Sequence, residues 1–375
     1  MRVSRLVSRA PLLGFVGIAA CDVYAIATDP SPRFIQTWNL PVTATRISVA
    51  SLLPAGVTIY STPASNPPDS SAFDVSMPSI NYSRPLGPNC SACQSISGTT
   101  ANKPAFNIGP GNNSAARLPA NVDSATVLGA TVTYTITNGF TFDPIRVNPS
   151  NPTGLPQGRI DIMIRSGSVV LTRDSLKGQN ATLPAGTSVT RSLPLPANKV
   201  GDSITVEMLV DSPAGEPVFM DASRSISANA SITNLRVADV KIRVPSAALS
   251  SGSPVEVDLG GIDSALTKRV IDGALELNVT NPFAVAGNLN VNFATSPGGV
   301  ISETATLAAV TTPQRLTVAF DSLEMSRIFR SDPPATLSMG GTVTAPAPIT
   351  VTPRQVISMS NRIILRIRLA FEGIN

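Results

Sequence analysis

Alternating apolar and polar positions dominate the chain, and one alternating stretch occurs twice. The first copy is residues 132–140, VTYTITNGF, and the second is residues 275–283, LELNVTNPF. Each copy places three apolar side chains on one face of an extended segment and then breaks at Thr-Asn, a turn residue and Phe. Equivalent positions are 143 residues apart (281 − 138). The recurrence predicts a repeated β module.

A second pair of alternating segments supports the repeat. Residues 158–164 and 287–293 both begin with glycine, and they are 129 residues apart (287 − 158). The first copy therefore carries 14 extra residues (143 − 129), which fall in the Pro- and Asn-rich segment 141–157. A turn-rich loop tolerates an insertion at small entropic cost. The alternative is chance, because period-two patterns recur in any β protein.

Short Val-, Ile- and Thr-rich runs separated by Pro, Gly, Asn and Ser predict an all-β protein of tandem β-sandwich modules, immunoglobulin-like in strand spacing. Two short helices are also expected, at 264–272, with Ser264 as the N-cap, and at 321–330, where four apolar residues recur. The remaining predicted strands are 46–50, 57–60, 73–77, 130–137, 169–171, 188–195, 204–210, 235–242, 349–351, 356–359 and 362–371.

The pattern divides the chain into a leader, a tether and two modules. Residues 21–43 are interpreted as an extended tether, with Trp38 packing its end onto the first module. The first module spans 44–230 and the second 231–375. Within the first, residues 61–121 are predicted to be a long, mostly irregular loop insertion, because they are rich in Pro, Gly, Asn and Ser.

Residues 275–283, where the alternating strand ends in Asn281-Pro282-Phe283, resemble part of the type 2 late-embryogenesis-abundant (water-stress) domain. That resemblance implies a β-sandwich with no catalytic residues to carry over. The first copy, which ends in Asn138-Gly139-Phe140, departs from the family pattern because Gly139 stands where the motif has proline. We interpret these six residues as a structural signature of the repeat.

The N-terminus is typical of a secretory signal peptide over residues 1–20. Arg2, Arg5 and Arg9 precede an apolar run too short to span a bilayer, and small residues lead to Cys21. Ile-Ala-Ala-Cys resembles the lipobox of bacterial lipoproteins. The chain as a whole also resembles a bacterial lipoprotein. The resemblance implies that Cys21 is acylated and anchors the protein to a membrane. Ordinary secretion and an uncleaved anchor are the alternatives.

If Cys21 is acylated, Cys90 and Cys93 are the two remaining thiols, in an oxidising compartment. We predict a local disulfide between them. A redox dithiol is disfavoured because residues 94–98 are expected to be a loop, whereas such motifs usually open a helix. Metal ligation is disfavoured because no histidine or second cysteine pair would complete a tetrahedral site.

The chain contains no histidine, which excludes Ser-His-Asp and Cys-His catalysis and His-ligated metals. It has 28 basic and 24 acidic residues, and removal of the leader's three arginines leaves 25 (28 − 3), so no electrostatic footprint for nucleic acid remains. Nucleotide-binding, zinc-protease, nucleophile-elbow and calcium-loop motifs are also missing from the sequence. We expect no enzymatic activity, metal or cofactor.

These features predict a lipid-anchored component of a bacterial cell envelope with a structural or binding role. It would face the periplasm from the inner or outer membrane, or lie on the cell surface. Its partner would be an envelope protein or polysaccharide. A periplasmic carrier of lipid or another apolar molecule is one alternative, motivated by low charge and few aromatics; a carboxylate-based hydrolase is the other. Specific function is expected where the copies differ.

Overall fold

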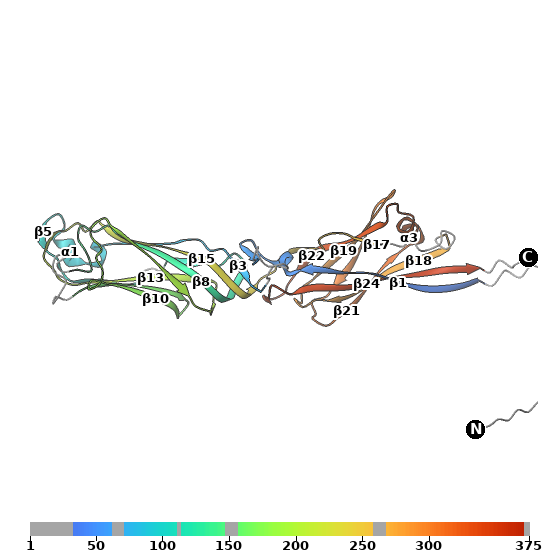
Figure 1. Cartoon of the computed structure of the whole chain (residues 1–375), viewed down its shortest axis with the longest axis horizontal. Helices are drawn as coiled ribbons and strands as arrows, with labels where there is room; N and C mark the ends of the chain where they lie inside the picture. Colours follow the sequence, from blue (N-terminus) through green and yellow to red (C-terminus); the bar gives the residue numbers. More distant parts are fainter. Residues whose placement is uncertain (1–32, 62–70, 111–113, 147–156, 258–267, 371–375) are drawn as a thin grey trace, which may run out of the picture.

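The computed structural model describes residues 33–61, 71–110, 114–146, 157–257 and 268–370. They form an all-β rod of two sandwich units joined end to end (Figure 1). We name these the first unit, which contains β2 to β15, and the second unit, which contains β1 and β16 to β24.

The first unit contains fourteen strands and two short helical segments, η2 Gly87–Asn89 and α1 Ser91–Ser95. Its strands are β2 Val57–Ile59, β3 Phe73–Val75, β4 Ile80–Pro85, β5 Thr100–Asn102, β6 Phe106–Ile108, β7 Ser114–Arg117, β8 Val122–Asn138, β9 Arg159–Ser166, β10 Val169–Lys177, β11 Ser188–Leu195, β12 Asn198–Val200, β13 Ser203–Ser212, β14 Pro217–Phe219 and β15 Ser225–Ile242.

The second unit begins with β1 Arg33–Ser48, is followed in the chain by the turn η1 Val49–Leu52, and carries helix α3 Ser322–Phe329. Its other strands are β16 Ala247–Ser250, β17 Val255–Val257, β18 Val270–Thr280, β19 Ala286–Thr295, β20 Gly299–Leu307, β21 Gln314–Phe320, β22 Ala335–Thr344, β23 Ile349–Val351 and β24 Val356–Ala370.

Both units are built on the same strand order. In the first, β11-β8-β15 form one sheet and β10-β9-β13 the other, with β4 added on β15 and both β6 and β7 on β13. In the second, β21-β18-β24 and β20-β19-β22 repeat this arrangement, with β1 added on β24 and both β16 and β17 on β22. The expected repeat is therefore present in the strand pairing.

The register is repeated as well. Ile162 lies opposite Met208 across β9 and β13, and Val291 lies opposite Met339 across β19 and β22. Alternation explains why β8 buries one face: Val132, Tyr134 and Ile136 are at most 1% exposed, while the threonines between them face outward.

Gly158 and Gly287 occupy equivalent places just before or at the start of β9 and β19. A Cβ atom at Gly158 would collide with the carbonyl oxygen of Asp211, and one at Gly287 would collide with that of Thr342. Close approach of the neighbouring strand thus requires glycine at both positions. The same close contact therefore explains both glycines, which mark the second pair of matching segments in the sequence.

The predicted tether and the start of the first module are wrong. Residues 33–43 lie in β1, which pairs with β24 over its whole length, so β1 belongs to the second unit. Trp38 lies opposite Leu365 and packs on the second unit, not the first. The first unit is consequently inserted between β1 and β16. Local sequence pattern does not reveal a strand partner that lies at the other end of the chain. Residues 21–32 lie outside the described residues.

The boundary placed at residue 231 is also wrong, because it falls inside β15. The second half of β15 stays paired with β8, with Ile242 opposite Val122. Its last three residues also pair with β23 of the second unit. β15 therefore joins the two units through continuous backbone hydrogen bonding.

The prediction that 61–121 is mostly irregular is wrong for the described residues, while the strand predicted at 73–77 is confirmed as β3. The segment contains β3 to β7 and α1, and Leu86, Cys93 and Ile108 are fully buried. β4 to β7 are three to six residues long, and none of them shows an alternating pattern long enough to be recognised. β3 and β4 pair with β15, β6 and β7 pair with β13, and β5 pairs with β14.

Of the two predicted helices, the second is confirmed as α3. Asp321 caps it, and Glu324 completes a capping box by accepting from the Asp321 N–H. The first helix is wrong from Val270 onward, where the chain enters β18; residues 264–267 lie outside the described part. No helix of the described residues has the length and apolar content to cross a membrane.

Candidate binding site

The repeated signature residues are structural in both copies. Asn138 is fully buried, and its Nδ2 donates to the carbonyl oxygens of Phe142 and Leu183, both at 2.8 Å. Asn281 is equally buried and donates to the carbonyl oxygens of Val285 at 2.8 Å and Ala308 at 3.3 Å. Each amide thus ties the turn after its strand to the segment that leads into the neighbouring edge strand.

The other signature residues support the same turn. Phe140 and Phe283 are 1% and 2% exposed, so both fill the core. Gly139 donates its N–H to the carbonyl oxygen of Ser225, a bond that Pro282 cannot make. The two copies therefore share the buried amide and the buried ring and differ in the backbone donor.

Cys90 and Cys93 have their sulfur atoms 2.00 Å apart, the distance of a disulfide. The pair lies at α1, at the end of the first unit farthest from β1 and β24 (Figure 1). Residues 94 and 95 were expected to be loop but belong to α1. The expected absence of a helix at the cysteine pair was the reason for disfavouring a redox dithiol, and that reason is wrong. Both sulfurs sit on residues at most 6% exposed, which limits access to a partner thiol.

Lys103, close to the disulfide end, is a buried cation without a sequence signal. Its Nζ donates to the carbonyl oxygens of Asp143 at 3.4 Å and Arg146 at 3.1 Å, and to Ser212 Oγ at 3.1 Å. Burial lowers the pKa of Lys103 to about 8, against the opposing charge of Asp143. These contacts hold the start of the β8–β9 connection, including part of the predicted insertion, against β13.

A polar cavity of about 400 Å³ opens at one edge of the first unit. It lies between β10, β11 and the turn that follows β10, and its lining is Arg173, Asp174, Ser175, Lys177, Asn180, Ala181 and Arg191. β10 and β11 are the outer strands of opposite sheets, so their side chains meet at the open edge of the sandwich. Arg146 supports the turn by donating its Nε to the carbonyl oxygens of Gly178 and Ala181, each at 3.0 Å.

A hydrogen-bonded network forms the base of this cavity. The buried Tyr134 donates its hydroxyl to Asp174 Oδ2, which also accepts from Arg191 Nη1 at 3.1 Å. Burial, followed by the bond to Asp174, raises the pKa of Tyr134 above its usual range. Burial alone would raise the pKa of Asp174, but hydrogen bonds from Tyr134, Ser175 and Arg191 outweigh it and lower that pKa. At neutral pH Asp174 is therefore an ionised carboxylate, held in place by hydrogen bonds from Tyr134, Ser175 and Arg191.

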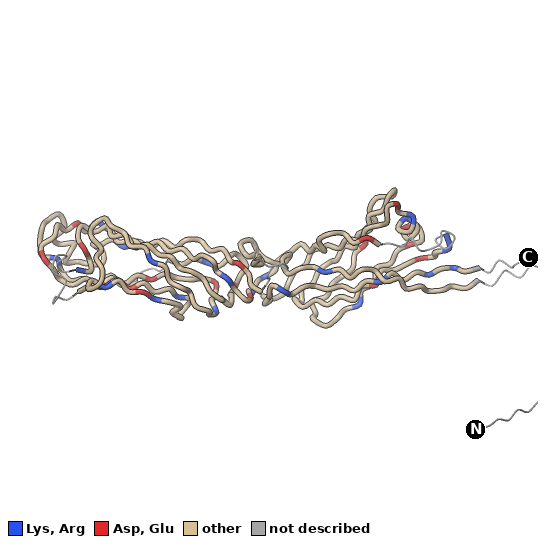
Figure 2. The backbone as a smooth tube through the Cα atoms, in the orientation of Figure 1, with Lys and Arg blue, Asp and Glu red and all other residues tan. Residues whose placement is uncertain are grey.

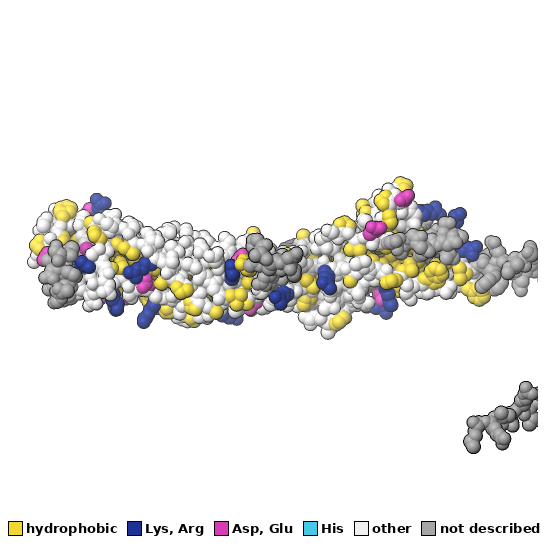
Figure 3. Space-filling model, viewed as in Figure 1, with side chains coloured by type: hydrophobic (Ala, Val, Ile, Leu, Met, Phe, Trp, Pro, Cys, Tyr) yellow, Lys and Arg dark blue, Asp and Glu magenta, His cyan; other side chains and the backbone are white. Residues whose placement is uncertain are grey.

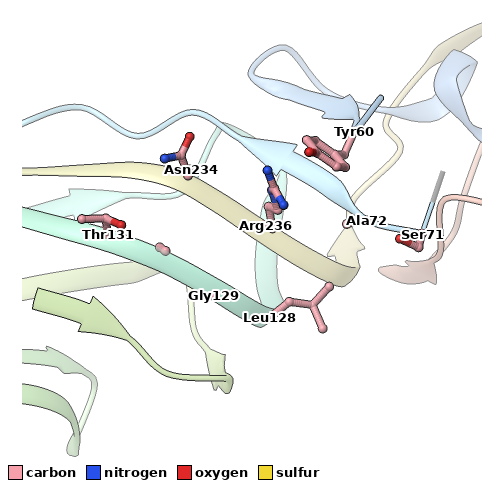
Figure 4. Close-up of a pocket in the computed structure, with 9 residues that line it drawn as sticks. Tyr60, Ser71, Ala72, Leu128, Gly129, Thr131, Asn234 and Arg236 are labelled. Carbon is pink, nitrogen blue, oxygen red and sulfur yellow. The ribbon is translucent and has the colours of Figure 1, made fainter. Parts of the chain in front are cut away.

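A second cavity, of about 410 Å³, lies beside bulged β15 where the two units meet (Figure 4). The guanidinium carbon of Arg236 is 3.9 Å from the ring centre of Tyr60, a cation–π contact that covers this ring. Leu128, on the opposite wall, is 50% exposed. The aromatic face that a ligand would stack on is thus occupied by an arginine.

Charged residues are spread along the length of the rod (Figure 2). Hydrophobic side chains are likewise distributed over several places on the visible face (Figure 3). The carboxylate of Glu276, in β18, is 1% exposed and lies between Arg315 and Arg362. In the part of the chain that the structure covers, no three His, Cys, Asp or Glu residues are grouped so as to hold a metal ion. Cys21 lies outside the described residues.

No protein-family model matches the chain, and no curated protein matches it. Among solved structures, it is similar to a "putative secreted protein" from Parabacteroides distasonis, with TM-score 0.32, 8% identity, and coverage of 88% of this chain and 99% of that one. The STIV MCP (Sulfolobus Turreted Icosahedral Virus) gives TM-score 0.15 at 11% identity, with 78% and 97% covered. A structure of infectious bursal disease virus, Gx strain, gives 0.16 at 10% identity, with 92% and 74% covered. TM-scores this low support no inference about this chain.

Proposed function

We propose that this protein is a non-enzymatic, lipid-anchored rod of a bacterial cell envelope, with a structural or binding role. The observation that carries the proposal is the placement of the described chain ends. Arg33 lies opposite Ala370 in the β1–β24 pair, at one end of the rod, while the Cys90–Cys93 disulfide lies at the other (Figure 1). An acyl chain on Cys21 would hold the second unit near the membrane and direct the first unit away from it.

The arrangement suits display better than catalysis. The two sandwiches are tied by β15, whose end pairs with β23, so the first unit is carried on a β-sheet connection instead of a free linker. A partner in the envelope, a protein or polysaccharide, would then meet the first unit. The lipid-carrier and hydrolase alternatives remain predictions; native mass spectrometry of gently purified protein tests the former by the presence of bound lipid.

The anchor is tested by the Cys21→Ala variant in cells fed a clickable fatty acid. We expect the wild-type protein to take up label and to sediment with membranes, and the variant to lose both properties. The Cys90→Ser/Cys93→Ser variant is the matched control, because it removes the other two cysteines and should keep the label. Unchanged membrane retention and labelling of Cys21→Ala would refute the proposed anchor.

A further inference from the structure

The two units differ sharply at the edge where the polar cavity of the first unit opens. Because their registers agree, each first-unit position has a counterpart in the second. Tyr134 lies opposite Arg191 across β8 and β11, and the equivalent pair across β18 and β21 is Leu277 opposite Leu316. A buried tyrosine and a cation in the first unit are thus replaced by two leucines in the second.

The exposed positions of the edge strand differ in the same way. Arg173 lies opposite Met163 across β9 and β10, and the equivalent pair in the second unit is Ser302 opposite Asn292. By the same register, the counterpart of Lys177 is Thr306. Three cations therefore line the first-unit edge, and their counterparts in the second unit are all uncharged.

The acidic position is retained. Asp174 lies opposite Ile162, and its counterpart Glu303 lies opposite Val291. In the first unit Asp174 accepts hydrogen bonds from Tyr134, Ser175 and Arg191. Its charge therefore holds Arg191 beside the cavity. The scaffold alone does not need this network, since the second unit forms the same sandwich without the tyrosine and the arginine.

The charges of the cavity do not balance. Asp174 offsets Arg191, with which it forms an ion pair at 3.1 Å. Arg173 and Lys177 are exposed, and within the described ranges neither forms an ion pair. The two exposed cations leave an excess of positive charge at the rim of the cavity, which attracts an anion. The amide of Asn180 adds an uncharged donor at the same rim.

We propose that this cavity binds an oxyanion, a carboxylate, phosphate or sulfate group carried by a ligand of the envelope. Arg173 and Lys177 hold the anion, and Asn180 donates to it. Arg191, oriented by Asp174 and Tyr134, forms the floor of the site. A planar guanidinium matches the two oxygens of such a group, and about 400 Å³ accommodates the group with an attached sugar or glycerol unit. The site does not depend on acylation of Cys21.

The test is calorimetric titration of the purified full-length protein with three probes: inorganic phosphate, galacturonate and the neutral sugar galactose. We expect phosphate or galacturonate, or both, to bind and galactose not to bind; the two anions distinguish a phosphate-bearing from a carboxylate-bearing ligand. Affinity should weaken with added salt, because exposed cations carry the interaction.

Variants locate the site. Arg173→Gln/Lys177→Gln should lower the affinity by on the order of tenfold to a hundredfold, as expected for the loss of charge-assisted contacts. Lys199→Gln, an exposed lysine on β12 of the same unit outside the cavity, should leave it unchanged. Thermal unfolding of each variant establishes that it is folded. Failure of both anions to bind, or equal loss in Lys199→Gln, would overturn the proposal.

Discussion

At the scale of single residues, two buried amides explain why the signature recurs. Asn138 and Asn281 are fully buried, and each donates to two backbone carbonyl groups, of which those of Phe142, Leu183 and Val285 belong to buried residues. The residues that precede each asparagine vary between copies, but the side chain that holds the turn does not. The shared requirement lies in the turn, and so the sequence keeps Asn and Phe while Gly139 and Pro282 differ.

Replacement of either asparagine by alanine should therefore destabilise its own unit. Asn138→Ala removes the donor to the buried carbonyl oxygens of Phe142 and Leu183, and Asn281→Ala removes the donor to the buried carbonyl oxygen of Val285. We expect each change to lower the free energy of unfolding by about 1–3 kcal/mol. Urea denaturation measures it. Asn107→Ala, at an exposed position of β6, is the control and should change stability little. An effect no larger than that of the control would contradict the role of the amides.

The burial of Lys103 leads to a prediction about how stability depends on pH. The pKa of Lys103 is about 8 in the folded protein, against 10.5 for an unperturbed lysine, so between these limits the unfolded chain binds more protons and stability rises with pH. Below pH 8 both states are protonated and the cost of burying the charge is fully present. From pH 8 to 9.5 we expect the wild-type protein to gain about 2 kcal/mol relative to Lys103→Met, which lacks the titrating group.

The measurement is the free energy of unfolding of both proteins across this range. The subtraction removes the contributions of other groups, including Tyr134, because both proteins carry them. A difference between the two proteins that stays constant with pH would show that Lys103 does not titrate there.

At the scale of elements, strands with clear alternation were predictable, including the three-residue β2, β3 and β23, whereas several others were not. β8, β9, β13 and β18 were recognised because apolar side chains at every second position must face the core. α3 was recognised from its apolar residues, and its capping box was not. β5, β6 and β7 were missed because they lie in a segment rich in Pro, Gly, Asn and Ser, and each takes its place from a partner strand. The polar cavity was missed for a related reason, since register alone brings Tyr134, Asp174 and Arg191 together.

The placement of β1 leads to a prediction at this scale. Ile47 is 1% exposed and lies opposite Ile357 of β24, so Ile47→Ala should destabilise the second unit by about 2–4 kcal/mol. Hydrogen exchange should become faster at amides of β18 and β24 and stay unchanged in β8 and β9. Ile35→Ala, at a position 58% exposed on the same strand, is the control. If exchange became faster only in the first unit, the assignment of β1 to the second unit would be wrong.

At the scale of the whole molecule, the insertion of one unit between β1 and β16 of the other determines the shape. The second unit holds the first described strand and the last, and the first unit is carried on β15 at the opposite end (Figure 1). This topology gives the rod one end with both described chain ends and another with the disulfide. A lipid at one end then leaves the other end free to meet a partner.

The rod shape is measurable in solution. A compact domain of 375 residues would have a radius of gyration of about 21 Å, so small-angle X-ray scattering should return a clearly larger value, with a distance distribution that has a long tail. The control is the same measurement in high salt, which should leave the shape unchanged because backbone pairing joins the units. A radius near the compact value would mean that the two sandwiches fold back on each other.

The sequence by itself determined the all-β class, the repeat and the faces that are buried, because these depend on the alternation of side chains along single strands. It also determined that imidazole chemistry is absent, because the chain has no histidine. Only the tertiary structure decided that residues 33–48 complete the second unit, that 61–121 is ordered where described, and that three cations and a buried tyrosine share one edge. Each of these depends on pairing between segments far apart in the chain, and a local pattern carries no record of its partner.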